Sequence, residues 1–486
     1  MKIFKSIMKI GITTFFAIIM AMCFSVTAKA DVAEELDYSV EMSNGSSGSN
    51  IKDGSYHTSV NFNAGDYVTI HSEQNIYGFY VVWGLPVEEW TLSANGTDSV
   101  QGKNEFLHDY IEFSEGVTEF TMKMDNGNQM LYIECYGEGE LPEDVQVWES
   151  SCEKADILLI SSHADDEILF FGPILPIYAR EKDMDVQVAY FSQYWTGATI
   201  REHEKLDGLW HSGVRNYPVT ADFDDYYADD LEHAKELFGY DKTLDWIVSL
   251  IREFKPQVVV CQDFDGEYGH GTHKLTAAAT AEAVEISMDE NSYPESAQLY
   301  GVWDVPKTYV HIYQENQIVL PCREPLASFD GKTALEISQE SYLKHVSQQW
   351  CWYYVDDEYE YSCAKYGLYR STVGADTGND MMENLKSYKV QEEERLKAEQ
   401  ESIAKEEAES ESMSIAEAES ISEAASIEAE REAENKADKE KRNTILIIVL
   451  VVVVVIFVPA LIYFFALVRA GKQNDKAHDK RRKRRK

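Results

Sequence analysis

The chain has 486 residues, with 85 Asp and Glu against 44 Lys and Arg, which gives a formal net charge of −41 at pH 7. A surface this acidic repels the phosphates of nucleic acids, so we expect no nucleic-acid partner. The length corresponds to about three domains. The hydrophobic content of 44% is ordinary for a globular protein.

Residues 1–30 have the features of a signal peptide. Lys2, Lys5 and Lys9 precede an apolar stretch, and the small residues of Ala28-Lys29-Ala30 fit a cleavage site. The mature chain would then begin near Asp31, and the alternative is an uncleaved anchor helix. Cleavage removes one of the seven cysteines and leaves six in an extracellular setting, where disulfides are possible.

Residues 31–146 read as a β domain. Segments such as "DYVTIHS" and "IYGFYVVWG" are rich in β-branched and aromatic residues, and glycine-rich polar stretches separate them. This pattern predicts a small antiparallel β-sandwich. We expect Trp83 and Trp90 in its core. With Tyr77 they could instead form aromatic platforms for sugars, as in a surface glycan-binding protein.

Residues 147–385 alternate between apolar strands and helices. Strands are expected at 155–161, 185–192 and 256–262, and helices at 166–181, 201–214, 243–255 and 272–287. Strand–helix alternation with fully apolar strands predicts a parallel sheet covered by helices on both faces. Ligands bind such sheets at the carboxyl ends of the strands.

The C-terminal part predicts a tether. Residues 386–442 are a low-complexity stalk rich in Glu, Ala and Ser, either helical or disordered. Residues 443–469 are predicted as a transmembrane helix, since 444–468 carry no charge, and the alternative is a buried soluble helix. The basic segment 470–486 would be the cytoplasmic tail, which places the preceding domains outside a cell membrane crossed once.

Two polar clusters lie where strands of the α/β region are expected to end. The first is "SSHADDE" at 161–167, and the second is "DGEYGHGTH" at 265–273. His163 and Asp166 are three residues apart, as are His270 and His273. Two histidines and one carboxylate with an open position are typical of a catalytic zinc site, and also of iron(II) oxygenases. Otherwise the acids could complement a helix dipole, and the histidines could be loop residues.

These stretches resemble a known family. "SHADDE" is similar to the His-Pro-Asp-Asp-Glu signature of the PIG-L/LmbE-like N-acetylglucosaminyl deacetylases, with Ala164 in place of the proline. "GEYGHGTH" resembles their second motif, and "REHEKLDGLWHSGV" their Arg-x-x-Glu helix with Arg201 and Glu204. "HVSQQ" at 345–349 and residues 366–385 resemble the closing segment. The resemblance implies a Rossmann-like fold and a zinc-dependent hydrolase.

The resemblance also implies roles for individual residues. The Zn²⁺ ligands would be His163, Asp166 and His273, with Asp165 as general base. His270, in its protonated form, would stabilise the oxyanion.

Three further residues are candidates near this site. Tyr268 would assist substrate binding at the oxyanion. Arg201 would hold sugar or phosphate oxygens, or else pair with Glu204 or another carboxylate. Glu167 would orient a histidine ligand, or else only complement the start of a helix.

The predicted function is that of a membrane-tethered extracellular N-deacetylase. Its substrate would be an acetylated amino sugar in a cell-wall glycan, an exopolysaccharide or a host glycan. The alternative is a non-catalytic surface protein for glycan binding or adhesion on the same fold. Among the cysteines, Cys351 and Cys363 form a plausible local disulfide, whereas Cys261 is expected to be a buried free thiol.

Overall fold

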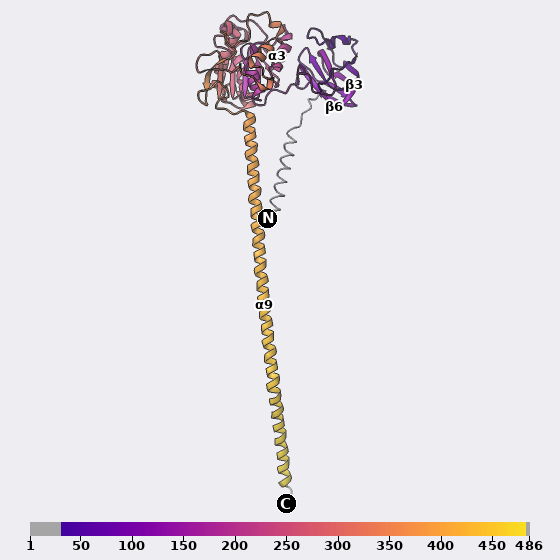
Figure 1. Cartoon of the computed structure of the whole chain (residues 1–486), viewed down its shortest axis with the longest axis vertical. Coiled ribbons are helices and arrows are strands. Elements are labelled where there is room, and N and C mark those ends of the chain that lie inside the picture. The colour runs from indigo at the N-terminus through magenta and orange to yellow at the C-terminus, as the bar shows by residue number, and fades with distance from the viewer. Residues whose placement is uncertain (1–30, 483–486) are drawn as a thin grey trace, which may run out of the picture. The chain divides into compact units, whose positions relative to one another are not determined.

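The computed structural model describes residues 31–482, with side chains described up to residue 469 (Figure 1). The predicted signal peptide lies outside the described residues. The chain divides into one compact unit that ends at Glu392 and a second unit that begins at Glu393. The first unit contains the β domain and the α/β region.

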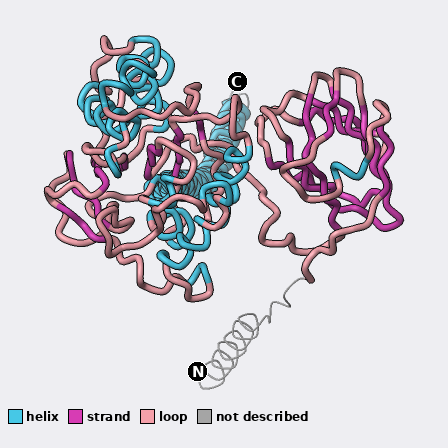
Figure 2. The backbone as a smooth tube through the Cα atoms, turned by 90° about the horizontal axis from the view of Figure 1, so that it is seen from above, coloured by secondary structure: helices cyan, strands magenta, loops and turns pink. Residues whose placement is uncertain are grey.

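The β domain is built only from antiparallel strand pairs, as predicted. Its strands are β1 Ser39–Met42, β2 Val60–Phe62, β3 Tyr67–Trp83, β4 Trp90–Ala94, β5 Thr97–Gln101, β6 His108–Met124 and β7 Asn128–Tyr136. The order is β2-β7-β3-β6-β4-β5, and β1 pairs with β3. The long strand β3 pairs with β1 near its start and with β7 near its end. The strands therefore form one continuous sheet around the core, rather than the two separate sheets of the expected sandwich (Figure 2).

The tryptophans of the β domain lie in its core. Trp83 is 1% exposed and Trp90 is 0% exposed, and the ring of Trp90 packs against those of Phe79 and Trp83. A fully buried ring cannot stack on a sugar, so these two residues do not form the aromatic platforms of the alternative interpretation.

The α/β region has a mixed sheet. Its strands are β8 Ile157–Ser161, β9 Val186–Tyr190, β10 Val219–Thr220, β11 Val258–Cys261, β12 Lys307–His311, β13 Gln317–Val319 and β14 Lys365–Ser371, in the order β10-β9-β8-β11-β12-β14-β13. The first five in this order are parallel, β14 runs antiparallel to β12, and β13 runs antiparallel to β14 and so in the direction of the first five. The prediction of an all-parallel sheet was wrong at this edge, because an apolar run indicates burial and not strand direction.

Helices cover both faces of this sheet (Figure 2). Alternate side chains of β8 point to opposite faces. Ile157 and Leu159 pack in one cluster with α3 and α8, while Leu158 and Ile160 pack in a second cluster with α5 and α6. The helices are α2 Asp166–Leu169, α3 Ile200–His211, α4 Leu231–Phe238, α5 Tyr240–Phe254, α6 Gly271–Ile286, α7 Pro294–Tyr300 and α8 Ala334–Tyr342.

The expected helix over 166–181 is interrupted. Helix α2 ends at Leu169, and a separate π-helical segment spans Leu175–Glu181. Gly172 and Pro173 lie in the gap, and proline disfavours the helical conformation of the residue before it. The helices expected at 201–214, 243–255 and 272–287 are present as α3, α5 and α6.

The stalk and the predicted membrane segment form one helix, α9, over Tyr388–Arg482. The structure thus favours the helical alternative for the stalk. Its part Tyr388–Arg469 contains an 18-residue window with mean hydropathy 3.7, of which none is buried. This helix is long and apolar enough to cross a membrane, and the alternative of a buried soluble helix does not hold.

All six cysteines of the described residues are free. The predicted pairing of Cys351 with Cys363 is wrong. Cys363 is fully buried, whereas Cys351 is half-buried with its Sγ 2.9 Å from the hydroxyl of Tyr342. Cys261 is a fully buried free thiol, as predicted.

Candidate active site

The two polar clusters of the sequence meet in space. His163 Nδ1 lies 3.1 Å from His273 Nε2, and Asp166 Oδ2 lies 2.9 Å from the first atom and 3.1 Å from the second. All three side chains are buried. Two imidazole nitrogens and one carboxylate oxygen therefore converge on one point, at the separations expected of atoms that share a small divalent cation.

The sheet brings these residues together. Strands β8 and β11 are parallel neighbours, so both polar clusters leave the same edge of the sheet. His163 follows β8 and Asp166 begins α2. His273 lies in the first turn of α6, whose N-cap is His270.

Asp166 is held in its charged form. Its Oδ2 accepts hydrogen bonds from the backbone N–H of His163 and from Nε2 of Gln262, both at 2.9 Å. Burial alone would raise the pKa of Asp166, but the imidazoles of His273 and His163 hold it well below its ordinary value. Gln262 follows β11, and sequence reasoning missed it.

A buried carboxylate orients His273. Glu267 Oε2 accepts a hydrogen bond from His273 Nδ1 at 2.8 Å, which leaves Nε2 of that histidine to face Asp166. The other oxygen of Glu267 lies 2.6 Å from Nδ1 of His311, whose Nε2 donates to the carbonyl of Ser362 at 3.0 Å. Glu267 and His311 are fully buried. A carboxylate behind a histidine ligand fixes its tautomer and raises its basicity.

Replacing Glu267 with glutamine is expected to weaken zinc binding about 10–100-fold, because the charge behind His273 is lost. The measurement is the zinc dissociation constant of the full chain by competition with a chromophoric chelator. Glu282→Gln is the control, since Glu282 lies further along α6, away from the site, and accepts a hydrogen bond from the hydroxyl of Tyr240. Equal zinc affinities for the two variants would refute the role of Glu267.

The donor set also predicts how metal binding depends on pH. Burial alone would lower the pKa of His273, but Asp166 and Glu267 on either side raise it to about 10. At neutral pH the metal-free site therefore holds a proton on His273, and a ligand nitrogen must lose its proton to bind a metal. We expect zinc affinity to rise about tenfold per pH unit between pH 7 and 9. Calorimetry in buffers of different ionisation enthalpy measures the released proton, and a pH-independent affinity would contradict this.

Asp165 precedes Asp166 in the chain but contributes none of the three converging atoms. Its backbone has φ 136°, a region that non-glycine residues rarely adopt, and such strain is concentrated at functional sites. Its N–H donates to Glu167 Oε2 at 2.7 Å, and its Oδ1 accepts from Arg201 at 2.9 Å. Burial raises the pKa of Asp165 to about 6, although Arg201 opposes this shift. A carboxylate with a pKa near neutral is suited to general base catalysis.

Arg201 pairs with Asp165 and not with Glu204. Its guanidinium donates to Asp165 and to the carbonyl of Ala164, and it lies 4.3 Å above the ring of Tyr194. The structure thus shows the ion pair with another carboxylate that the sequence left open. Glu204 instead accepts hydrogen bonds from the backbone and side chain of Ser347.

Asp225 is a further carboxylate at this site that the sequence reasoning missed. Its Oδ1 lies 3.6 Å from Nε2 of His163, and its Oδ2 lies 3.6 Å from Nη1 of Arg201. It therefore lies between a candidate ligand and the partner of Asp165. It comes from the loop after β10, which carries no motif.

His270 is a neutral imidazole in this structure. Burial and the neighbouring rings of His163 and His273 lower the pKa of His270 to about 2, so the expected protonated form is not supported. Its Nδ1 accepts a hydrogen bond from the N–H of Thr272 at 3.3 Å. The proton of the neutral ring is therefore on Nε2, which can donate to an oxyanion without a positive charge. His163, His270 and His273 together also form a three-histidine group with nitrogens within 4.8 Å of one another.

Tyr268 and Glu167 complete the predicted set. The ring of Tyr268 lies 5.6 Å from His270 and 5.2 Å from His273, and it stacks on Tyr353 at 4.3 Å. Glu167 does not contact a candidate ligand. Its Oε1 lies 2.9 Å from Nε2 of His345, the buried histidine of "HVSQQ", because the short helix α2 turns Glu167 away from His163 and His273.

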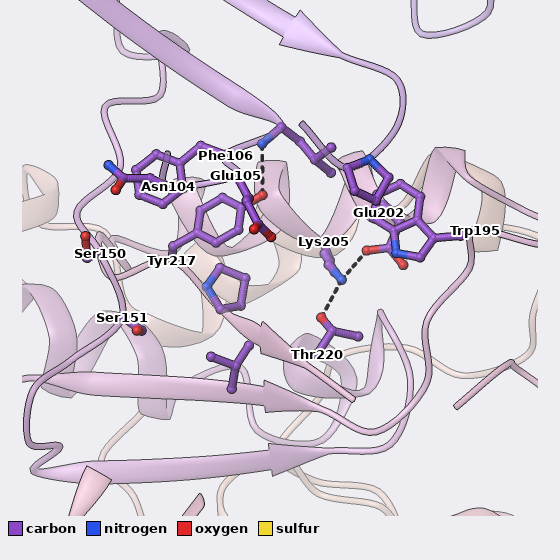
Figure 3. Close-up of a pocket in the computed structure, with 14 residues that line it drawn as sticks. Asn104, Glu105, Phe106, Ser150, Ser151, Trp195, Glu202, Lys205, Tyr217 and Thr220 are labelled. Atoms are coloured by element: carbon purple, nitrogen blue, oxygen red, sulfur yellow. Dashed lines mark hydrogen bonds and ion pairs between the residues drawn. The ribbon is translucent and has the colours of Figure 1, made fainter. Parts of the chain in front are cut away.

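Helix α3 connects this site to the β domain. On one side it carries Arg201. On the other, His203 Nδ1 lies 2.9 Å from Nε2 of His108 in β6, and Asp207 accepts hydrogen bonds from Tyr56 at 3.0 Å. A separate cavity of about 400 Å³ lies at this junction, where buried Lys205 pairs with Glu202 and with Thr220 (Figure 3). The cavity is lined by neither the candidate ligands nor Asp165.

Comparison with protein families agrees with this geometry. Residues 158–284 match the family described as PIG-L, GlcNAc-PI de-N-acetylase. We refer to the α/β region that contains this match as the PIG-L domain. The match covers β8, α2, α3, β11 and α6, and so includes both polar clusters. The resemblance that the motifs predicted is thereby confirmed.

Relatives of the PIG-L domain include proteins named as a deacetylase and as an amidase. The chain is 25% identical over 187 residues to 1D-myo-inositol 2-acetamido-2-deoxy-alpha-D-glucopyranoside deacetylase 1 of Catenulispora acidiphila, a match that covers 32% of this chain and 54% of that protein. It is 33% identical over 108 residues to mycothiol S-conjugate amidase of Streptomyces coelicolor, which covers 22% of this chain and 35% of that protein. The chain thus spans about half, or less, of the length of these relatives.

Among solved structures, the chain is similar to N,N'-diacetylchitobiose deacetylase of Pyrococcus horikoshii. The TM-score is 0.30 and the sequence identity 17%, with 40% of this chain and 71% of that chain covered.

Proposed function

We propose that the PIG-L domain is a zinc-dependent deacetylase that hydrolyses the acetamide of N-acetylglucosamine-type amino sugars to acetate and a free amine. The observation that carries this proposal is the convergence of His163, Asp166 and His273 within 3.1 Å, with Asp165 beside them. The donor set of two imidazoles and one carboxylate is that of catalytic zinc sites. A carboxylate that provides no atom to this set remains free to act as a base.

Each residue of the site has a separate role in the proposed hydrolysis. Bound zinc supplies a Lewis acid and a water of lowered pKa. Asp165 accepts the proton of the attacking water, and Arg201 holds its carboxylate in place. His270 donates a hydrogen bond from Nε2 to the oxygen that becomes negative when the carbonyl is attacked, and Tyr268 flanks the same region. Asp165 then returns its proton to the leaving nitrogen, so that the C–N bond breaks and the amine departs neutral.

The proposed setting is the outer face of a cell membrane. The apolar part of α9 crosses the bilayer, and the basic segment 470–486 stays on the cytoplasmic side. The domains before α9 then face outward, and so their substrates are glycans of the cell wall, of an exopolysaccharide or of a host. The signal peptide proposed at residues 1–30 is consistent with export of these domains.

The test uses the full chain in detergent, stripped of metal and reloaded with zinc, with iron(II) or with no metal. Acetate and primary amine are measured after incubation with N-acetylglucosamine oligomers. We expect equal amounts of acetate and amine, formed fastest with zinc and negligibly without metal. Stoichiometric zinc binding with no acetate from any acetylated amino sugar would refute the proposal. Activity with iron(II) alone would refute the choice of metal.

A further inference from the structure

A row of exposed aromatic side chains lies on the segment that packs against the site. Trp350 is 76% exposed, Trp352 is 87% exposed and Tyr354 is 51% exposed. We call these three residues the aromatic ledge. Isolated exposed apolar residues are common, but two tryptophans and a tyrosine within five positions are not, and such patches mark binding surfaces.

Exposed and half-buried side chains alternate along residues 350–354, which form a turn, two bends and an irregular stretch after the short helix Val346–Gln348. Cys351 and Tyr353, between its members, turn inward and pack against the core. Cys351 is held by the hydroxyl of Tyr342, and Tyr353 stacks on Tyr268 at 4.3 Å. These two contacts anchor the segment to the core, while the three residues of the ledge remain exposed.

The ledge continues into the site. Tyr353 contacts Tyr268, and the ring of Tyr268 lies 5.6 Å from that of His270. On the other side of His270, Tyr227 lies 4.9 Å away, edge to face, and is 67% exposed. Aromatic rings thus lie on both sides of His270, the residue proposed to donate a hydrogen bond to the oxyanion. Flat apolar rings with polar edges are suited to the apolar faces of sugar rings.

Acidic residues near these rings are expected to favour some sugar substrates over others according to the charge of the sugar. The segment 345–361 contains Asp356, Asp357, Glu358 and Glu360 but no lysine or arginine. Residues 221–230, which carry Tyr227, contain five aspartates and no lysine or arginine. Arg323 pairs with Asp357 and Glu358, but the carboxylates outnumber it. A rim with a net negative charge repels phosphorylated substrates and attracts the ammonium groups of deacetylated residues.

We propose that the aromatic ledge binds sugar units adjacent to the one being deacetylated, so that the substrate is an uncharged or amine-bearing amino-sugar chain and not a phosphorylated glycolipid. This inference rests on the proposed function, and it names the substrate class of that site. Chain units already deacetylated carry ammonium groups that suit the acidic rim. The product of one turnover therefore remains a good ligand for the next.

The test compares N-acetylglucosamine and its oligomers up to the hexasaccharide as substrates of the zinc-loaded full chain. For the unmodified protein, kcat/KM should rise with chain length. Trp350→Ala and Trp352→Ala should each lower kcat/KM for the hexasaccharide about five- to tenfold and leave the monosaccharide unchanged. Trp352→Phe keeps a ring and should retain most of the activity. Leu299→Ala, which removes a 72% exposed side chain of α7, should change neither substrate. Because the tryptophans are exposed, their removal should not unfold the protein.

A binding measurement separates failure of the ledge from failure of the enzyme. Calorimetry of the metal-free full chain with the hexasaccharide should give binding that Trp350→Ala/Trp352→Ala abolishes, whether or not any substrate is hydrolysed. Equal losses for monosaccharide and hexasaccharide, or none for either, would overturn the ledge as a subsite. It would also be overturned if the double variant bound glycan normally but changed from oligomer to monomer in light scattering, since the ledge would then hold a second copy of the chain. Faster hydrolysis of a phosphorylated N-acetyl amino sugar than of its neutral counterpart would overturn the charge selection.

Discussion

Replacing His273 with alanine is expected to abolish both metal binding and deacetylation. One of three converging donor atoms is lost, and Asp166 and Glu267 lose the imidazole that lies between their charges. Zinc content after dialysis should fall from about one ion to below about 0.1 ion per chain. Breaking this buried charge arrangement also costs about 3–5 kcal/mol of unfolding free energy.

The measurements are metal analysis of the dialysed full chain, acetate release and thermal unfolding. His273→Gln keeps a polar group at the position and should restore part of the stability without restoring zinc. His233→Ala removes a half-exposed histidine of α4 that pairs only with exposed Asp229, and should be unchanged in all three assays. A His273→Ala protein that folds and retains a full equivalent of zinc would show that the metal is held elsewhere.

Replacing Asp165 with asparagine is expected to separate catalysis from metal binding. The asparagine oxygen can still accept from Arg201, so the geometry is kept, but the amide cannot accept the proton of the attacking water. We expect kcat/KM to fall about 10²–10⁴-fold. Zinc content should stay at one ion per chain, because Asp165 contributes none of the three converging atoms.

The control for this variant is Asp229→Asn, which neutralises an aspartate whose side chain is 77% exposed and which should leave both rate and zinc content unchanged. The decisive measurement is acetate release together with metal content on the same preparation. Asp165→Asn with more than a tenth of the original kcat/KM would show that another group takes the proton.

The candidate site was largely predictable because its motifs are local. The pairs His163/Asp166 and His270/His273 are each three residues apart, and one rule about the carboxyl ends of parallel strands is enough to bring them together. The structure places atoms of His163, Asp166 and His273 within 3.1 Å of one another, and the nitrogens of His163, His270 and His273 within 4.8 Å. The direction of β14 was not predictable, because the composition of a strand is the same for either orientation.

The residues that orient the site were not predictable from spacing. Glu267 is six positions before His273, a spacing that does not place two residues on one face of a helix. It reaches His273 because the chain folds back through left-handed conformations at Gly266 and Tyr268, and a Cβ at Gly266 would lie 2.6 Å from the carbonyl of His270. Its second partner, His311, comes from β12, 44 positions further along. Contacts of this kind depend on the folded backbone and leave no periodic pattern in the sequence.

Helix α3 has a consequence for how the protein can be divided. Arg201 on this helix holds Asp165, while His203 and Asp207 meet His108 and Tyr56 of the β domain. A truncated enzyme that starts at residue 147 would lose those two partners and uncover polar groups that are now out of water. Such a fragment would be prone to aggregate or to misplace its catalytic carboxylate, so the smallest autonomous enzyme should retain residues that precede the family's own sequence signature.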